Sequence, residues 1–284
     1  VLYMTEYRAL RQKHSMLEIG KNPELALEVT LQPLGMGMDA AILFADILLL
    51  LEPMGAPFEF AKGEGPVIHE PVRDRAAIER LRTFPIEEGL GYVLDAVKLI
   101  RKELDGKTPL IGFSGAPFTI ASYLIEGGKS SDYRRTKVLM WTDPEAWHLL
   151  MGKISSVVSD YLAAQVTAGA QALQLFDSWA GALTIEDYLE FVMPHVKGIL
   201  KKAETLGVPV IHFGTNTYPL LELQVEAGGT VIGLDHRTPI EEGWRRVGYD
   251  RAIQGNMDLL LWCAPILVAE KAATEILKAV GTRP

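Results

Sequence analysis

A repeated unit governs what this chain can fold into: an amphipathic helix, a glycine, and then a short apolar strand. The clearest copy is a helical run that starts near Asp143 and stops at Gly169, directly before the largely apolar residues 171–176. Glycine suits the left-handed backbone conformation that commonly ends a helix. Segments of this kind predict six strands, at residues 39–47, 109–113, 171–176, 208–213, 230–234 and 252–254.

Nearly continuous apolar strands separated by helices predict a parallel sheet that is covered on both faces. Periodicity alone leaves two alternatives, an open doubly wound sheet and a closed barrel. Polar or glycine-containing clusters follow the strands, and they favour the barrel because catalytic groups of barrels lie at the carboxyl ends of the strands. These clusters are residues 45–46, 114–115, 177–178, 214–216, 235–237 and 255–256.

The predicted architecture is therefore an α/β fold, a (β/α)8 TIM-type barrel that occupies residues 1–284 as a single domain. A chain of 284 residues suits one barrel, since barrels of this class typically run to about 250 residues. Six strands do not close an eight-stranded barrel. We therefore expect that the given sequence lacks the first and last strand segments, because Val1 starts abruptly and Pro284 follows a helix-ending Gly281.

Charge and composition exclude several classes of function. The net charge of −8 argues against broad binding to nucleic acids or anionic membranes. The longest apolar run, residues 40–51, is too short to span a bilayer, which needs about 20 residues. The single cysteine, Cys263, excludes a disulfide within the chain and fits a reducing compartment. We expect a cytoplasmic protein that binds neither nucleic acid nor membrane.

Asp46 is the most informative single residue, because it places a carboxylate at the end of the apolar segment 39–47. A buried carboxylate is costly unless a cation or a hydrogen-bond donor meets it, and we expect the substrate to do so. The alternative is that Asp46 caps the next helix through its side-chain oxygen. Residues 47–51 continue apolar without a clear helix start, so the residues alone leave function and capping open.

A motif that could suggest a nucleotide cofactor lacks the required context, and no metal-binding motif is present. Residues 35–40 match the letters of a dinucleotide fingerprint, but that fingerprint must follow a strand and open a helix, and here the order is reversed. No His-x-Cys or His-Glu-x-x-His pattern is present, so no protein-bound metal is predicted. Cys263 lies beside Trp262 in an apolar segment and is interpreted as a core or interface residue.

Seven segments, taken together, resemble the uroporphyrinogen decarboxylase family. They appear in the family's order and with similar spacing over nearly the whole chain, which is far more specific than any single motif. The segments are residues 6–11, 31–33, 39–48, 109–117, 122–128, 169–181 and 254–256.

This resemblance implies a cofactor-free barrel enzyme, a carboxy-lyase that converts the four acetate side chains of uroporphyrinogen III to methyl groups and gives coproporphyrinogen III in haem synthesis. It also implies a homodimer with a tetrapyrrole substrate. Asp46 would bind the pyrrole N–H groups and stabilise the positive charge that develops on the ring. An apolar cleft with a few placed polar groups is what a large flat ligand requires.

The resemblance assigns roles to further residues. Tyr123 and Ser178 would hydrogen-bond substrate carboxylates, and apolar walls would come from Phe44, Phe113 and Phe176. Without the resemblance, Tyr123 is interpreted as a core residue of a helix, and residues 177–178 as a helix cap.

The chain also departs from the family's pattern. An arginine-containing segment would lie just before Val1 and a Gly-His-Gly segment just after Pro284, and Asp235 is followed by His236 where tryptophan is common. Two alternative functions follow. One is a cobamide-dependent methyltransferase of the same superfamily, which would need a zinc site built from histidine and cysteine. The other is a non-catalytic porphyrin-binding protein.

Overall fold

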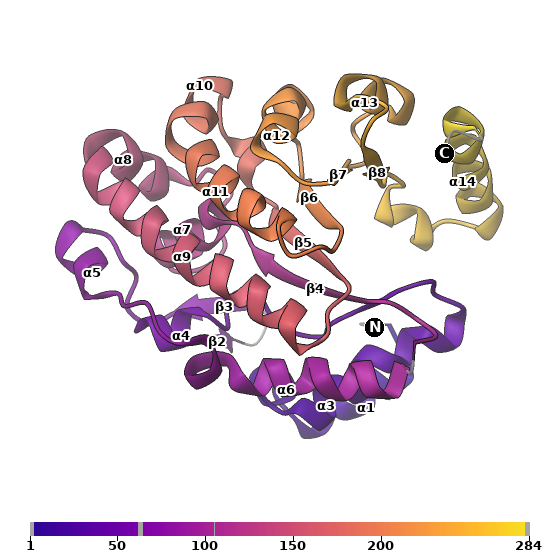
Figure 1. Ribbon diagram of the computed structural model, residues 1–284, viewed down its shortest axis with the longest axis horizontal. Helices are drawn as coiled ribbons and strands as arrows, with labels where there is room; N and C mark the ends of the chain where they lie inside the picture. The colour runs from indigo at the N-terminus through magenta and orange to yellow at the C-terminus, as the bar shows by residue number, and fades with distance from the viewer. Residues whose placement is uncertain (1–2, 62–64, 105, 282–284) are drawn as a thin grey trace.

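A parallel sheet forms the centre of the molecule (Figure 1). The structure is a computed structural model that describes residues 3–61, 65–104 and 106–281; Val1 and Pro284 lie outside the described residues. Six strands of the described part make up this sheet, and each overlaps a predicted strand. They are β1 (Ala41–Ile42), β4 (Leu110–Gly115), β5 (Ala172–Asp177), β6 (Val210–Gly214), β7 (Val231–Gly233) and β8 (Ala252–Gln254).

The strand order decides between the two sheet architectures. The order is β1-β4-β5-β6-β7-β8, so the strands follow one another in space as they do along the chain. A doubly wound sheet reverses direction at a switch point, whereas a barrel adds each strand on the same side of the last one. The observed order is that of a barrel, and neighbouring strands pair in parallel throughout the described sheet.

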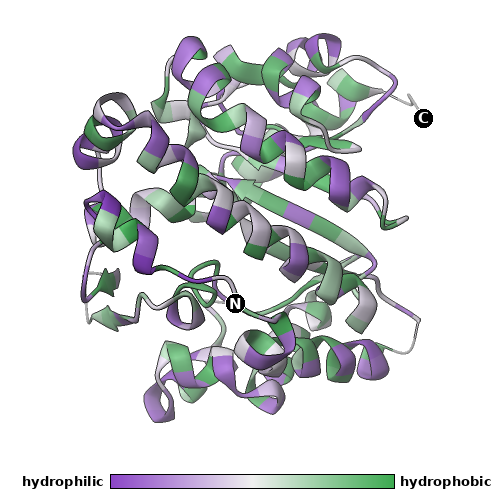
Figure 2. Cartoon of the chain, turned by 60° about the vertical axis from the view of Figure 1, so that its left-hand side comes forward, coloured by the Kyte–Doolittle hydropathy of each residue, from purple (hydrophilic) through white to green (hydrophobic). Residues whose placement is uncertain are grey.

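Helices lie around the sheet, and Figure 2 shows them banded with hydrophilic and hydrophobic residues. No helix in the described ranges is long and apolar enough to cross a membrane. The first helices are α1 (Thr5–Lys13), α2 (Met16–Lys21), α3 (Pro23–Leu31), η1 (Gln32–Met36), α4 (Leu51–Met54), α5 (Arg75–Arg80) and α6 (Ile86–Leu104). Next come α7 (Pro117–Glu126), α8 (Arg134–Thr142), α9 (Pro144–Ala168), η2 (Ala180–Ala182), α10 (Ile185–Asp187), η3 (Tyr188–Val192) and α11 (Met193–Glu204). The last are η4 (Tyr218–Leu220), α12 (Leu221–Ala227), α13 (Ile240–Val247), η5 (Leu259–Cys263) and α14 (Ile266–Val280).

Helix α9 confirms the boundaries predicted for the clearest copy of the repeated unit. The Asp143 side chain accepts a hydrogen bond from the Ala146 N–H and so caps the start of the helix. Gly169 follows the end of the helix with a φ of 125°, a backbone conformation that glycine adopts without steric cost. The chain then enters β5 at Ala172.

Strand β1 is shorter than predicted, because it covers Ala41–Ile42 rather than residues 39–47. The Leu43 N–H still donates to the Ile111 carbonyl of β4 at 3.0 Å. The next N–H, that of Phe44, donates instead to Thr30 Oγ1 on α3 at 2.9 Å. This N–H points away from β4, and the strand has ended by this residue, so Asp46 lies in the connection after β1 rather than within a strand.

A hairpin outside the main sheet is absent from the predicted elements. Its antiparallel strands are β2 (Phe58–Ala61) and β3 (Gly65–Ile68). The Ile68 N–H donates to the Gly127 carbonyl at 2.9 Å, which joins the hairpin to the end of α7. A helix and a glycine, α4 and Gly55, do precede β2, but the exposed Glu59 interrupts this short strand, so it lacks the nearly continuous apolar run that marks the predicted strands.

Gln165 of α9 ties the helical layer to the sheet. Its side chain is fully buried. Its Oε1 accepts from the Phe113 N–H and its Nε2 donates to the Phe113 carbonyl, both at 2.9 Å. The amide therefore satisfies both backbone groups of one residue in β4 and holds the Phe113 backbone in place.

Cys263, at the end of η5, is exposed, so its interpretation as a core residue is wrong. Its neighbour Trp262 is exposed as well. The apolar segment that contains both residues forms a short 3-10 helix on the surface rather than an element of the core. The alternative role of Cys263, at an interface, stays a prediction.

Candidate active site

Asp46 is positioned by a turn that follows β1. Its Oδ1 accepts a hydrogen bond from the Leu48 N–H at 2.8 Å, in a turn over residues 47–50 that leads into α4. Such a contact between side chain and backbone is typical of aspartate in turns. The interpretation of Asp46 as the cap of the next helix is wrong, because α4 has Leu50 at its N-cap position and no side-chain cap. The other oxygen, Oδ2, has no hydrogen-bond partner among the described residues. The turn contact orients the carboxylate through one oxygen and leaves the second oxygen available.

The electrostatic environment of Asp46 disfavours its charge. Burial raises the pKa of the Asp46 carboxyl, and the hydrogen bond from the Leu48 N–H offsets this only in part. No cationic side chain in the described part of the chain contributes to this shift. The carboxylate is therefore not neutralised by the described residues, which is the condition expected for an anion that meets its partner in the substrate.

Tyr123, on α7, lies close enough to Asp46 for the two to interact electrostatically. Burial, and then the negative charge of Asp46, raise the pKa of Tyr123 to about 12. The hydroxyl is therefore protonated at neutral pH and can donate a hydrogen bond. Its ring packs on Trp179 with centroids 4.2 Å apart, which restrains the side chain near the end of β5. Tyr123 is only partly buried, so it is not confined to the core.

A row of aromatic rings crosses three neighbouring strands. The ring centroids of Phe113 on β4 and Phe176 on β5 are 5.5 Å apart, and those of Phe176 and Phe213 on β6 are 6.1 Å apart. Both pairs meet edge to face. Phe176 and Phe213 are direct partners in the β5–β6 register. Phe113 and Phe176 are predicted site residues; Phe213 is not, although it occupies the equivalent position near the end of the next predicted strand.

Close packing joins the connection that contains Asp46 to this aromatic row. Gly115 ends β4 and is the register partner of Phe176. A Cβ atom on Gly115 would lie 3.1 Å from the Ile47 Cβ and 3.0 Å from Ile120 Cγ1. Glycine suits this position because the segment after Asp46 approaches the β4 backbone closely. Ile47, the residue after Asp46, therefore packs on Gly115, which lies opposite Phe176 in the sheet.

The ring of Phe44 does not lie in the aromatic row of Phe113, Phe176 and Phe213. Its ring lies 5.8 Å from that of Tyr7 and packs against a small core cluster with Ile19 and Val29. It also lines a separate cavity of about 210 Å³ between α3 and β1. The early end of β1 explains the position, because the Phe44 backbone has turned toward Thr30 of α3.

Asp177 does not cap a helix, so the capping interpretation of residues 177–178 is wrong. Its Oδ2 accepts from the Tyr188 hydroxyl at 3.3 Å, both side chains are fully buried, and η2 begins only at Ala180 without a side-chain cap. Ser178 is partly buried, and its carbonyl accepts a hydrogen bond from the Thr215 hydroxyl. This contact joins the loops that follow β5 and β6.

The main cavity, of about 670 Å³, opens at the carboxyl ends of β5 to β8. Phe176 and Phe213 belong to its wall, and Ser178 contacts the wall through Thr215. Asp46, Tyr123 and Phe113 are not part of the wall. The remaining lining residues are not among the predicted site residues, although several belong to the polar clusters after the strands; they are Gln174, Leu234, Asp235, His236, Arg237, Gln254, Gly255, Asn256, Met257, Asp258, Leu259 and Leu260.

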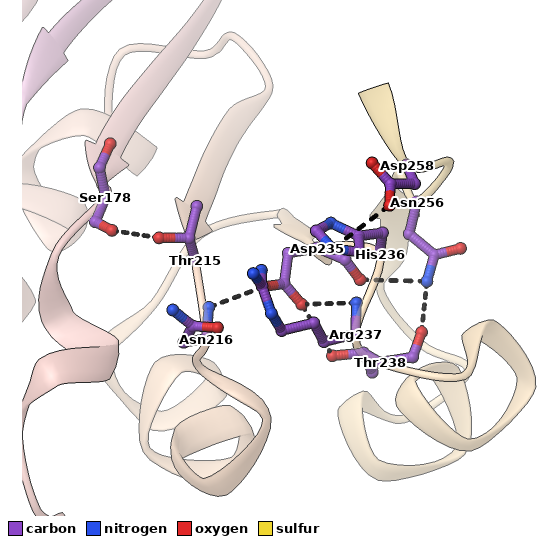
Figure 3. A network of polar contacts seen from close by, with 9 residues as sticks. All are labelled: Ser178, Thr215, Asn216, Asp235, His236, Arg237, Thr238, Asn256 and Asp258. Atoms are coloured by element: carbon purple, nitrogen blue, oxygen red, sulfur yellow. Dashed lines mark hydrogen bonds and ion pairs between the residues drawn. The ribbon is translucent and has the colours of Figure 1, made fainter. Parts of the chain in front are cut away.

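A polar network organises the loops around this cavity (Figure 3). Asp235, which follows β7, accepts from the Asn216 N–H at 2.7 Å and from the Arg237 N–H at 3.1 Å. The Asn256 amide nitrogen donates to the Asp235 carbonyl at 3.1 Å and also to the Thr238 carbonyl. The loops after β6, β7 and β8 are thereby held together. Within the described ranges, no group of three or more histidine, cysteine, aspartate or glutamate side chains could hold a metal ion.

Sequence comparisons relate the chain to one family. A family profile described as uroporphyrinogen decarboxylase (URO-D) matches residues 1–284. The chain is 74% identical over 281 residues to a uroporphyrinogen decarboxylase of Sorangium cellulosum (strain So ce56), with 99% of this chain and 80% of that protein covered. It is 54% identical over 283 residues to the uroporphyrinogen decarboxylase of Carboxydothermus hydrogenoformans, with 99% and 81% covered.

Solved structures show the same fold. A methyltransferase from Methanosarcina mazei superposes with a TM-score of 0.76 at 20% identity, covering 92% of this chain and 78% of that one. A B12-independent methionine synthase from Shewanella sp. W3-18-1 superposes with a TM-score of 0.52 at 11% identity, covering 90% and 86%. At these identities the likeness concerns the fold alone. It confirms the predicted α/β fold of the TIM-barrel type.

Proposed function

Because the chain belongs to the uroporphyrinogen decarboxylase family, we propose that it removes carbon dioxide from the four acetate side chains of uroporphyrinogen III and so forms coproporphyrinogen III in porphyrin biosynthesis. It is an enzyme, a carboxy-lyase. The observation that supports this chemistry best is Asp46, a partly buried carboxylate that no cationic side chain of the described residues neutralises.

The reaction needs a place for positive charge. A proton adds to the ring carbon next to the one that bears an acetate arm, and the ring becomes cationic at the arm-bearing carbon and at the nitrogen. The bond between the arm and its carboxylate then breaks, its electron pair passes into the ring, and carbon dioxide leaves. A second proton converts the arm to a methyl group while the ring carbon gives up the first proton. The Asp46 carboxylate, held in a site of low dielectric, would stabilise the ring at the stage when it is cationic.

The other predicted residues fit supporting roles. The Tyr123 hydroxyl, protonated at neutral pH, would donate to a substrate carboxylate, and Ser178 would do the same from the loop after β5. Phe113 and Phe176, together with Phe213, would supply the apolar wall against which a flat macrocycle packs. Phe44 is proposed as a further apolar wall by resemblance, although its ring packs on that of Tyr7.

The decisive test is turnover of the reduced substrate. The full-length protein, incubated with uroporphyrinogen III without added metal or cofactor, is expected to give coproporphyrinogen III through intermediates with seven, six and five carboxylates. Chromatography after oxidation separates these species by carboxylate number. Tight binding without any loss of carboxylates would favour a non-catalytic porphyrin-binding protein instead.

The activity is expected to fall as the pH drops through the pKa of Asp46. The carboxylate must be ionised to stabilise a cation, and burial raises its pKa, so the acidic limb of kcat/KM should lie above the ordinary carboxyl value of about 3.9. A pH profile of kcat/KM checks this. Substrate carboxylates also titrate in the acidic range, and their effect on kcat/KM would remain in an Asp46→Asn variant. The acidic limb that is due to Asp46 would be absent from the pH profile of that variant. A limb unchanged in that variant would exclude Asp46 as its source.

We also propose that residues 1–284 act as one catalytic domain in a cytoplasmic homodimer. Within the described ranges, the largest group of buried apolar residues extends from Ala26 to Ala227, and the other two groups are small. The single cysteine fits a reducing compartment. Exposed apolar side chains on η5 and α14, including Trp262 and Leu267, are suited to contact with further protein.

A further inference from the structure

One cationic side chain at the main cavity has no assigned role. Arg237, in the loop after β7, lines the cavity, and its side chain is 55% exposed. Its Nη1 donates to Asp235 Oδ2 at 3.3 Å. The other side-chain N–H groups of Arg237 have no hydrogen-bond partner among the described residues. A guanidinium has five N–H donors, so most of them are available to a ligand.

Asp235 fixes the position of this guanidinium. Its side chain is only 4% exposed, and its carboxylate also accepts from the backbone N–H groups of Asn216 and Arg237. In Figure 3 the guanidinium end of Arg237 lies beside Asp235 and Asn216. Because the backbone of two loops holds the carboxylate, the arginine is anchored in advance of binding and would lose less conformational entropy when a ligand arrives.

The rest of the cavity wall suits an apolar ring that has acidic groups at its edge. Most of its large side chains are apolar: Phe176, Phe213, Leu234, Met257, Leu259 and Leu260. Two further wall residues, His236 and Asp258, face each other with Nε2 and Oδ2 3.7 Å apart. Among the described residues that line the cavity, Arg237 is therefore the one with a permanent positive charge. A single fixed cation beside large apolar surfaces is complementary to a carboxylate carried by a flat macrocycle.

We propose that Arg237 binds a carboxylate of the tetrapyrrole substrate through the N–H groups that Asp235 does not use, and that Asp235 is the positioning residue for it. This inference rests on the proposed function, since it takes the main cavity as part of the substrate site. Arg237 would be a specificity-determining residue in the loop after β7. Asp46 follows β1, and three strands of the sheet, β4, β5 and β6, lie between β1 and β7. The fork of a guanidinium allows bidentate recognition, which lysine cannot reproduce fully.

Substitution by methionine tests the proposal, because it keeps much of the side-chain length and removes the charge. Arg237→Met is expected to raise KM for uroporphyrinogen about tenfold and to change kcat less than about threefold. Arg237→Lys should recover part of the loss. Arg245→Met is the matched control: Arg245 lies on α13, pairs with Glu242 at 2.6 Å, is 62% exposed and does not line the cavity. Its KM should equal that of the unmodified protein.

A double variant separates binding from folding. Removing Arg237 alone takes one donor from the buried Asp235 carboxylate and could loosen the loop. Asp235→Asn combined with Arg237→Met removes the buried charge together with its partner. Thermal unfolding of both variants shows whether the fold persists. A raised KM in the folded double variant would assign the effect to the missing cation, whereas a normal KM there would overturn the proposal.

Direct binding makes the test independent of turnover. Titration by fluorescence with uroporphyrin, the oxidised octa-acid, is expected to show about tenfold weaker binding to Arg237→Met, whereas the uncharged octamethyl ester should bind both proteins equally. Unchanged uroporphyrin affinity and unchanged KM in the folded variants would overturn the inference while leaving the proposed function intact. An unmodified protein that binds uroporphyrin but never decarboxylates the reduced form would instead refute the proposed function.

Discussion

Replacing Asp46 by asparagine is expected to lower kcat/KM by at least about 100-fold, because the amide keeps the shape of the side chain and removes the charge that stabilises the cationic ring. The Leu48 N–H can still donate to the asparagine side-chain oxygen, so the turn after β1 should be retained. Steady-state kinetics with uroporphyrinogen measures the effect. A loss of less than about tenfold would contradict the role given to Asp46.

The stability of this variant provides an independent check. The pKa of Asp46 is raised in the folded state, so folding disfavours the ionised carboxylate. The free energy of unfolding is therefore higher at low pH, where Asp46 is protonated, and falls as the pH rises through the folded-state pKa. At neutral pH the buried charge therefore destabilises the fold. Asp46→Asn should leave the free energy of unfolding unchanged or raise it. Asp39→Asn, at an exposed position before β1, is the matched control and should alter neither activity nor stability.

Replacing Gln165 by leucine is expected to lower the free energy of unfolding by about 2–5 kcal/mol, because two buried backbone groups of Phe113 lose their partners. Leucine has a similar volume, so the loss reflects unpaired polar groups rather than a cavity. Chemical denaturation measures it. Since Phe113 belongs to the aromatic row, the variant should also have reduced activity at temperatures where it remains folded.

Gln171→Leu is the matched control for this variant. Gln171 is exposed, and its Oε1 accepts one hydrogen bond, of 3.3 Å, from the Leu110 N–H. Leu110 and Phe113 both belong to β4, so the two glutamines contact the same strand. Its replacement should lower the free energy of unfolding by less than about 1 kcal/mol, because water can accept a hydrogen bond from the Leu110 N–H. Equal losses in the two variants would show that the bidentate contact of Gln165 has no special importance.

The six strands of the sheet are predictable because their signals are local. Apolar runs mark them, usually after a helix and a glycine, and burial on both faces requires such runs in any parallel sheet. The polar clusters favour a barrel, and the strand order then decides for it. The hairpin of β2 and β3 lacks such an apolar run, although α4 and Gly55 precede it, and a distant contact with the end of α7 helps to hold it.

The candidate site is predictable only in part. Asp46 stands out because a carboxylate in an apolar segment is energetically unusual. It does not cap the next helix; one oxygen accepts from the Leu48 N–H in the turn, and the other has no hydrogen-bond partner in the described part. The position of Phe44 could not be foreseen, because its N–H donates to a side chain on another element, Thr30 of α3.

By itself, the amino-acid sequence determined the strands of the main sheet and the family, because apolar spacing, glycine positions and collinear motifs can all be read along the chain. Only the tertiary structure decided which side chains share a cavity. Arg237, Asp235 and Asn216 meet because loops after two different strands converge at one edge of the sheet, and hydrogen bonds between those loops set the distances. Proximity across the sheet depends on register and on packing between distant segments, and these leave no periodic trace along the chain.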